Sequence, residues 1–157
     1  MPPPVRENLP VPVETRFVLV AAVILVVIAA GLFWKSRTGR AQRVAGGQLI
    51  DLAKLGATKN GQPVTAFGER MTFLQFSTEF CSQCVQTARV YKELEEHSEG
   101  ILHIEVDITN RLDLAKEFNV LQTPTTLVLD AGGRVTSRIG GATKAQTIKD
   151  EIGHFTI

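Results

Sequence analysis

The chain has 157 residues, of which 44% are hydrophobic and 21% charged, with 17 Lys and Arg against 16 Asp and Glu. This length suits one folded domain of roughly 100 to 150 residues with a modest appendage, and it argues against a second domain. The near-balanced charge argues against a nucleic-acid partner. Only two cysteines occur, Cys81 and Cys84, which excludes a disulfide-dense secreted scaffold, and both lie within four residues of each other.

The N-terminal third contains an uninterrupted apolar run. Residues 17–34, FVLVAAVILVVIAAGLFW, carry no charge and would span about 27 Å as a helix, close to the hydrocarbon thickness of a bilayer. We predict a single-pass transmembrane helix at 17–34 that anchors the protein in the cell membrane. A cleaved signal peptide is the alternative, which the length of the run and the basic residues after it disfavour.

The segments on either side of this helix are predicted to lack packed structure. Residues 1–16 contain five prolines and are predicted to form a disordered leader. Residues 35–46 are basic and small, as in a linker. Four Lys and Arg in residues 35–50, against two in the leader, favour a cytoplasmic domain, but a margin of two charges leaves the opposite side open.

Residues 47–157 are predicted to form one α/β domain. The stretch 48–55 fits a short helix or an edge strand, and a turn follows at 61–63. Two predicted strands then alternate with two predicted helices, in the order strand 71–76, helix 81–97, strand 101–108 and helix 112–118. Strands joined in this way should be parallel.

The end of the chain supplies a hairpin and a last helix. The β-branched run 125–129, the turn 130–133 and the alternating residues 134–139 predict two antiparallel strands. An amphipathic helix is expected at 143–154. The predicted fold is an α/β sandwich with a mixed central sheet flanked by helices.

Cys81 and Cys84 stand where the strand at 71–76 passes into a helix. Free N–H groups and the positive end of the helix dipole stabilise a thiolate there, so the pKa of Cys81 is predicted to lie below the usual value of about 8.5. Cys81 would attack a substrate disulfide, and Cys84 would resolve the mixed disulfide. A zinc site would need four ligands, and beside this pair the chain offers only three scattered histidines, with no second pair at ligand spacing. A structural bond is also disfavoured, because closing so short a loop would stabilise little. We therefore expect a redox-active disulfide and no metal or other cofactor.

These features, taken in order over residues 71–155, resemble the thioredoxin family. The resemblance implies a three-layer thioredoxin-like fold and thiol–disulfide oxidoreductase activity. It also implies that Pro124 is a cis-proline, that the Thr123 backbone pairs with the substrate, and that Phe80 and Gly140 border the substrate groove. A strand-end turn remains an equally simple explanation of Gly140.

The chain departs from the usual thioredoxin pattern near the cysteines. A Phe replaces the usual Trp before Cys81, and Ser-Gln replaces Gly-Pro between the two cysteines. Gln75 occupies the position of a buried Asp in thioredoxin and cannot take a proton. Help with deprotonating Cys84 would then come from water or from His103, which matches a thioredoxin Lys, although a lone His on a strand is more often simply packed.

The uncharged Ser-Gln pair predicts only a moderate lowering of the Cys81 pKa, which favours a reductant of protein disulfides. An upstream thiol donor would supply its electrons. An extracytoplasmic thiol oxidase or a cytochrome-maturation-type reductase is the alternative. A non-catalytic binding module with the same fold is a third reading, against which the intact cysteine pair argues.

Overall fold

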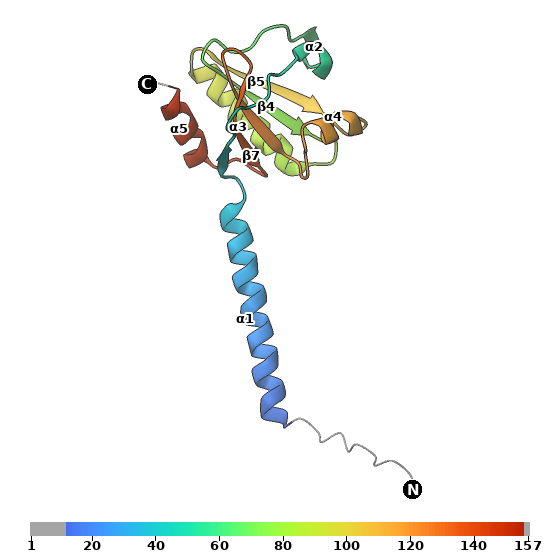
Figure 1. Ribbon diagram of the computed structural model, residues 1–157, viewed down its shortest axis with the longest axis vertical. Coiled ribbons are helices and arrows are strands. Elements are labelled where there is room, and N and C mark those ends of the chain that lie inside the picture. Colours follow the sequence, from blue (N-terminus) through green and yellow to red (C-terminus); the bar gives the residue numbers. More distant parts are fainter. Residues whose placement is uncertain (1–11, 156–157) are drawn as a thin grey trace. The chain divides into compact units, whose positions relative to one another are not determined.

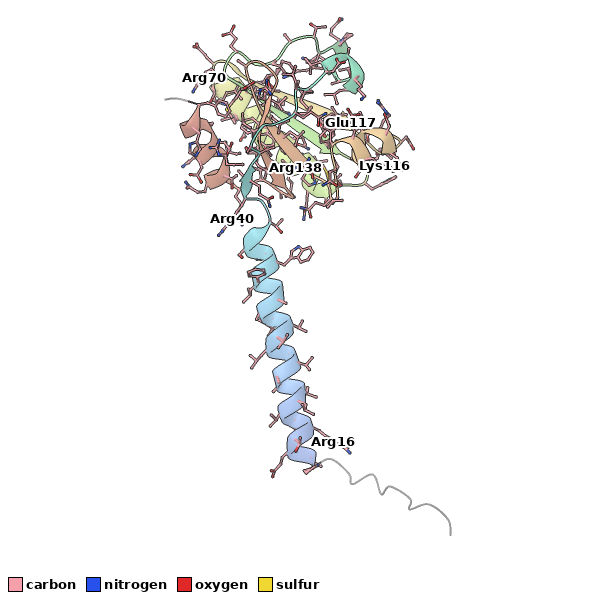
Figure 2. All side chains as sticks on the ribbon, viewed as in Figure 1. Arg16, Arg40, Arg70, Lys116, Glu117 and Arg138 are labelled. Atoms are coloured by element: carbon pink, nitrogen blue, oxygen red, sulfur yellow. A yellow bond between two sulfur atoms is a disulfide. The ribbon has the colours of Figure 1, made fainter. Side chains whose placement is uncertain are left out.

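A computed structural model describes residues 12–155, and it divides the chain into two compact units, residues 1–37 and 38–157 (Figure 1). Most of the predicted disordered leader, residues 1–11, lies outside the described part. The first unit consists of helix α1, Val13–Arg37. By length and composition alone, α1 could cross a membrane. Its apolar side chains stand out on every side of the helix (Figure 2).

Helix α1 begins four residues before the predicted start and ends three residues after the predicted end. Residues 13–16, expected in the leader, are therefore helical. The prolines reach only to Pro12, whose carbonyl accepts a hydrogen bond from Arg16 N at 3.2 Å, and the acidic Glu14 suits the first turn. Nothing after Pro12 opposes a helix.

The second unit is built on a five-stranded mixed sheet with the order β1-β7-β6-β4-β5. Its strands are β1 Ala41–Arg43, β4 Met71–Ser77, β5 Ile101–Asp107, β6 Thr125–Asp130 and β7 Val135–Gly140. Strands β4 and β5 are parallel, as predicted, and the other pairs are antiparallel. All seven residues of β4, which lies between β6 and β5, are buried, which explains its mostly apolar and aromatic sequence.

Helices cover both faces of this sheet. Helices α3 Ser82–His97 and α5 Ala145–His154 pack on one face, where Phe73, Tyr91 and Ile148 share a core. Helices α2 Leu52–Leu55 and α4 Leu112–Glu117 pack on the other, where Leu74 and Leu114 belong to a second core. Successive residues of β4 thus serve opposite cores, as the two-residue period of a strand requires. The predicted thioredoxin-like sandwich is confirmed.

The predicted linker at 35–46 differs from the structure. Strand β1 lies within it and pairs with β7, with Ala41 opposite Ile139 and Arg43 opposite Ser137. This pairing covers the outer edge of β7, which would otherwise expose unpaired backbone groups. Three residues without apolar alternation carry too little pattern to reveal such a strand. The second unit accordingly begins at residue 38, before the predicted boundary at 47.

The stretch that the sequence left open contains parts of both alternatives. Helix α2 is capped by Asp51, whose carboxylate accepts a hydrogen bond from Ala53 N at 3.0 Å, while Leu49 forms a β-bridge with Arg134. A small hairpin follows, with strands β2 Thr58–Lys59 and β3 Gln62–Pro63. Its turn residues Asn60 and Gly61 both have positive φ, at 52° and 77°.

Candidate active site at the Cys-Ser-Gln-Cys turn

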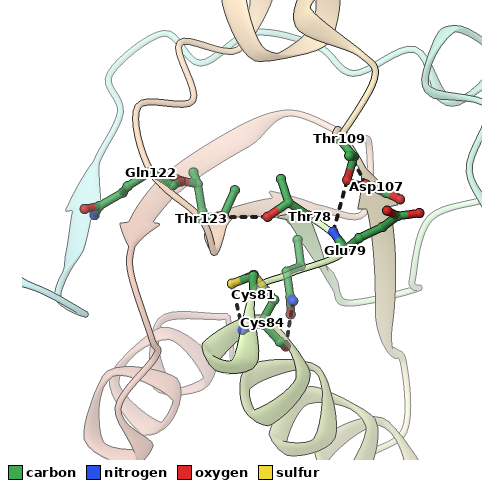
Figure 3. The surroundings of a disulfide bond; sticks show 10 residues. Thr78, Glu79, Cys81, Cys84, Asp107, Thr109, Gln122 and Thr123 are labelled. Atoms are coloured by element: carbon green, nitrogen blue, oxygen red, sulfur yellow. Dashed lines mark hydrogen bonds between the residues drawn. A yellow bond between two sulfur atoms is a disulfide. The ribbon is translucent and has the colours of Figure 1, made fainter.

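The two cysteines lie at the start of helix α3 and form a disulfide (Figure 3). Cys81 is the N-cap residue in an extended conformation, and Cys84 lies in the first turn. Cys84 is only 2% exposed, whereas Cys81 is partly exposed. An incoming sulfur can therefore reach Cys81 more easily than Cys84.

The helix start already provides a hydrogen bond to the exposed sulfur. Cys84 N donates to Cys81 Sγ at 3.1 Å and also to the Cys81 carbonyl at 3.0 Å, so this N–H at the helix start is shared between two acceptors. After reduction, the same N–H and the helix dipole would face a sulfur able to carry negative charge. The arrangement suits a nucleophilic thiolate at Cys81.

The loop before β6 faces the cysteines, and the Thr123–Pro124 bond is cis, as the resemblance implied. Two hydrogen bonds fix this loop: Gly141 N donates to Pro124 O at 2.7 Å, and the Thr125 hydroxyl donates to Gln122 O at 2.7 Å. A third contact joins the hydroxyls of Thr123 and Thr78, 3.3 Å apart. The cis-proline loop is thus held beside the disulfide.

Apolar side chains stand out from the surface in both loops. Phe80, directly before Cys81, is 95% exposed, and Leu121, in the cis-proline loop, is 86% exposed. One precedes the attacking cysteine and the other lies in the loop that faces it, so both are candidates for contact with a substrate chain. Sequence reasoning proposed Phe80 from its neighbour Cys81 but missed Leu121, whose loop carries no apolar pattern.

Gly140, the last residue of β7, borders the same loop. A Cβ atom placed on Gly140 would lie 2.6 Å from Gln122 Nε2, and Gly140 O accepts a hydrogen bond from Gly39 N at 2.8 Å. The side chain of Gln122 therefore occupies the space that any larger residue would need. Gly140 is both a strand end and a neighbour of the cis-proline loop, and its contact with a substrate stays a prediction.

Gln75 lies beneath the second cysteine, on the face of the sheet that α3 covers. Its side chain is fully buried, and its Nε2 donates to the backbone carbonyl of Cys84 at 3.0 Å. An amide at this place holds the helix start against the sheet. Because an amide cannot accept a proton at neutral pH, Gln75 does not act as a base for Cys84.

His103 lies on the same face of the adjacent strand, where it is opposite Phe73 in the register. Its ring packs against Tyr91 with ring centroids 5.3 Å apart. Burial, and then the nearby Lys59 ammonium, lower the pKa of His103 to about 4. The imidazole is therefore neutral at pH 7 and a weak base. These contacts favour the packed interpretation of His103 over proton transfer.

The loop leading to Cys81 is held by residues that sequence reasoning missed. Cys81 N donates to Thr78 O at 3.2 Å, and Glu79 N donates to the Thr109 hydroxyl at 3.0 Å. That hydroxyl in turn donates to Asp107 at 2.6 Å and, with the Thr109 backbone N–H, lowers the pKa of the Asp107 carboxyl. The Asp-x-Thr pattern at the end of a strand was the available signal, because such residues often close local turns.

Within residues 12–155, no group of three His, Cys, Asp or Glu side chains could hold a metal ion. The site has a buried Cys beside a partly exposed Cys, at a helix start that faces a cis-proline loop. This arrangement is typical of a thiol–disulfide oxidoreductase. The thioredoxin family model matches residues 52–154. The chain therefore belongs to the thioredoxin family.

The chain is also similar to solved structures of thioredoxins. The short form of spinach chloroplast thioredoxin f is 24% identical, with 57% of this chain and 80% of that chain covered and a TM-score of 0.50. The reduced thioredoxin pre-protein of Schistosoma mansoni is 25% identical, with 56% and 81% covered and a TM-score of 0.46. No curated protein matches the sequence of this chain.

Proposed function

We propose that this protein is a membrane-anchored reductase of protein disulfides that works through Cys81 and Cys84 alone, without a metal or other cofactor. The observation that carries the proposal is the placement of an accessible Cys81 at the N-cap of α3, directly above a Cys84 that is 2% exposed. The accessible sulfur can attack a substrate disulfide, and the buried sulfur can then attack the mixed disulfide that forms.

The proposed reaction transfers two electrons in two exchange steps. The Cys81 thiolate attacks one sulfur of the substrate disulfide, a mixed disulfide forms, and the other substrate sulfur leaves as a thiolate and takes a proton. Cys84 then loses its proton and attacks Cys81 Sγ, which releases the second substrate thiolate. The Cys81–Cys84 disulfide remains and has to be reduced by an upstream thiol donor.

We propose that the pair reduces its substrates because few groups stabilise the Cys81 thiolate. Ser82 and Gln83 carry no charge, so the thiolate is supported by the helix start and the Cys84 N–H. A strong oxidant needs a reduced form that is stabilised much further. A dithiol that gives up its electrons readily suits this site better.

Membrane attachment through residues 17–34 is proposed from the apolar surface of α1. The flanking basic residues favour a cytoplasmic domain. The two native cysteines can be changed to Ser and a single Cys introduced at the exposed Thr65. Labelling by an impermeant maleimide only after permeabilisation of the cells supports the cytoplasmic side. Labelling of intact cells contradicts it and favours the extracytoplasmic oxidase or cytochrome-maturation-type reductase.

The redox role itself is tested on the full chain in detergent micelles. We expect the chain to reduce insulin disulfides with a thiol donor present, and we expect Cys81→Ser to abolish this reduction. Equal rates for the two proteins would instead indicate a non-catalytic binding module. We also expect the reduction potential of the cysteine pair to lie near the value of about −270 mV of a thioredoxin, and a value near about −120 mV would indicate an oxidant.

A further inference from the structure

Two loops form the walls of the exchange site, and a pair of threonine hydroxyls joins them. Thr78 lies in the loop between β4 and α3, and Thr123 directly precedes the cis-proline (Figure 3). Their Oγ1 atoms are 3.3 Å apart, although 45 residues separate them along the chain. The contact therefore links the position of one wall to that of the other.

Thr78 is also bonded to the attacking cysteine. Its backbone carbonyl accepts a hydrogen bond from Cys81 N at 3.2 Å. The next residue, Glu79, is tied to Thr109 on the opposite side of the loop, which limits how the loop can move. Thr78 thus contacts the backbone of Cys81 through its carbonyl and the cis-proline loop through its side chain.

We infer that Thr78 is a positioning residue, which sets the spacing between Cys81 and the strand of substrate that pairs with Thr123. The inference rests on the proposed function and extends it, because it names the residue that aligns a peptide disulfide with the attacking sulfur. Thr78 acts through Thr123 and does not itself touch the reacting sulfurs. A substrate without a peptide chain needs no such alignment.

The separation of 3.3 Å is longer than the usual 2.7 to 2.8 Å of a hydroxyl pair, so the contact is a weak one. Its loss should therefore cost little affinity in absolute terms. A hydrogen bond of ordinary strength corresponds to a change of roughly two- to twelvefold in an equilibrium, and we expect about three- to fivefold here.

The test measures the formation of a mixed disulfide, so that it does not depend on the physiological direction. The full chain carrying Cys84→Ser, in detergent micelles, is mixed with an activated disulfide on a ten-residue peptide or with the same activated disulfide lacking a peptide. Release of the aromatic thiol gives the rate constant at a series of concentrations, for Thr78→Val, Thr78→Ser and Thr123→Val. Thr65→Val, at an exposed position away from the cysteines, is the matched control.

We expect Thr78→Val to weaken the apparent affinity for the peptide disulfide about three- to fivefold and to leave the rate with the small disulfide within about 1.5-fold. Thr78→Ser, which keeps the hydroxyl, should restore the peptide reaction. The double variant Thr78→Val/Thr123→Val should be no worse than either single variant, because both remove the same contact.

Three results would overturn the inference: an unchanged peptide reaction in Thr78→Val, an equal loss for both disulfides, or additive losses in the double variant. An equal loss would mean that Thr78 acts on Cys81 itself. Failure of the proposed function looks different, since the parent Cys84→Ser protein would then react with neither disulfide.

Discussion

Gln75 offers the most direct test of the buried surroundings of Cys84. The change Gln75→Glu keeps the size and shape of the side chain. While protonated, the introduced carboxyl can still donate a hydrogen bond to Cys84 O, as the amide does now at 3.0 Å. Once ionised, it loses that donor and places a charge at a position with no solvent exposure.

The size of the effect follows from this burial. Desolvation raises the pKa of a fully buried carboxyl by about 3 pH units above its unfolded value of about 4.3. The folded state then binds the proton more tightly than the unfolded state, so stability falls as the pH rises from about 4 to about 7. At about 1.4 kcal/mol for each tenfold change in proton affinity, the loss reaches roughly 4 kcal/mol near neutral pH.

The assay is urea unfolding of the full chain in detergent micelles, followed by circular dichroism between pH 4 and pH 8. We expect the variant to match the parent protein near pH 4 and to become less stable toward pH 7. Gln75→Met, which is similar in size and cannot ionise, is the control and should show no such pH dependence. A Gln75→Glu variant as stable as the parent at pH 7.5 would refute the placement of Gln75 under Cys84.

Four further predictions concern other parts of the chain. Changing Cys84 to Ser should trap substrates as mixed disulfides on Cys81, visible as adducts on non-reducing gels, whereas Cys81→Ser should trap none. Burial lowers the pKa of His103 to about 4, so the folded state binds fewer protons than the unfolded state. The free energy of unfolding should therefore fall by roughly 3 kcal/mol as the pH drops from about 6.5 to 4. In acid unfolding curves, His103→Gln should make this fall smaller. The pH–rate profile above pH 6 should be unaltered in His103→Ala; a shifted profile would restore a role in proton transfer. A fragment of residues 38–157 should melt several degrees higher than one of residues 47–157, because the shorter fragment loses β1 and its pairing with β7.

The sequence was sufficient wherever a pattern is local and repeats. The apolar run at 17–34, the buried β4 and the helix after Cys81 all follow from hydrophobic spacing along one segment. The cysteine pair also needs only local geometry, since its members are three positions apart, within one helical turn. The cis state of the Thr123–Pro124 bond came from the resemblance, because sequence alone gives a trans bond the higher prior.

Tertiary structure decided the features that join distant segments. Strand β1 exists because the outer edge of β7 needs a partner, and that edge lies about 95 residues further along the chain. The hydroxyl contact of Thr78 with Thr123 and the low pKa of His103 depend likewise on neighbours brought in by folding. The spacing of hydrophobic residues, helix caps and turn residues each act over a few positions, so they can be predicted from the sequence. Burial and cross-strand contact are properties of the packed sheet and appear only when it has formed.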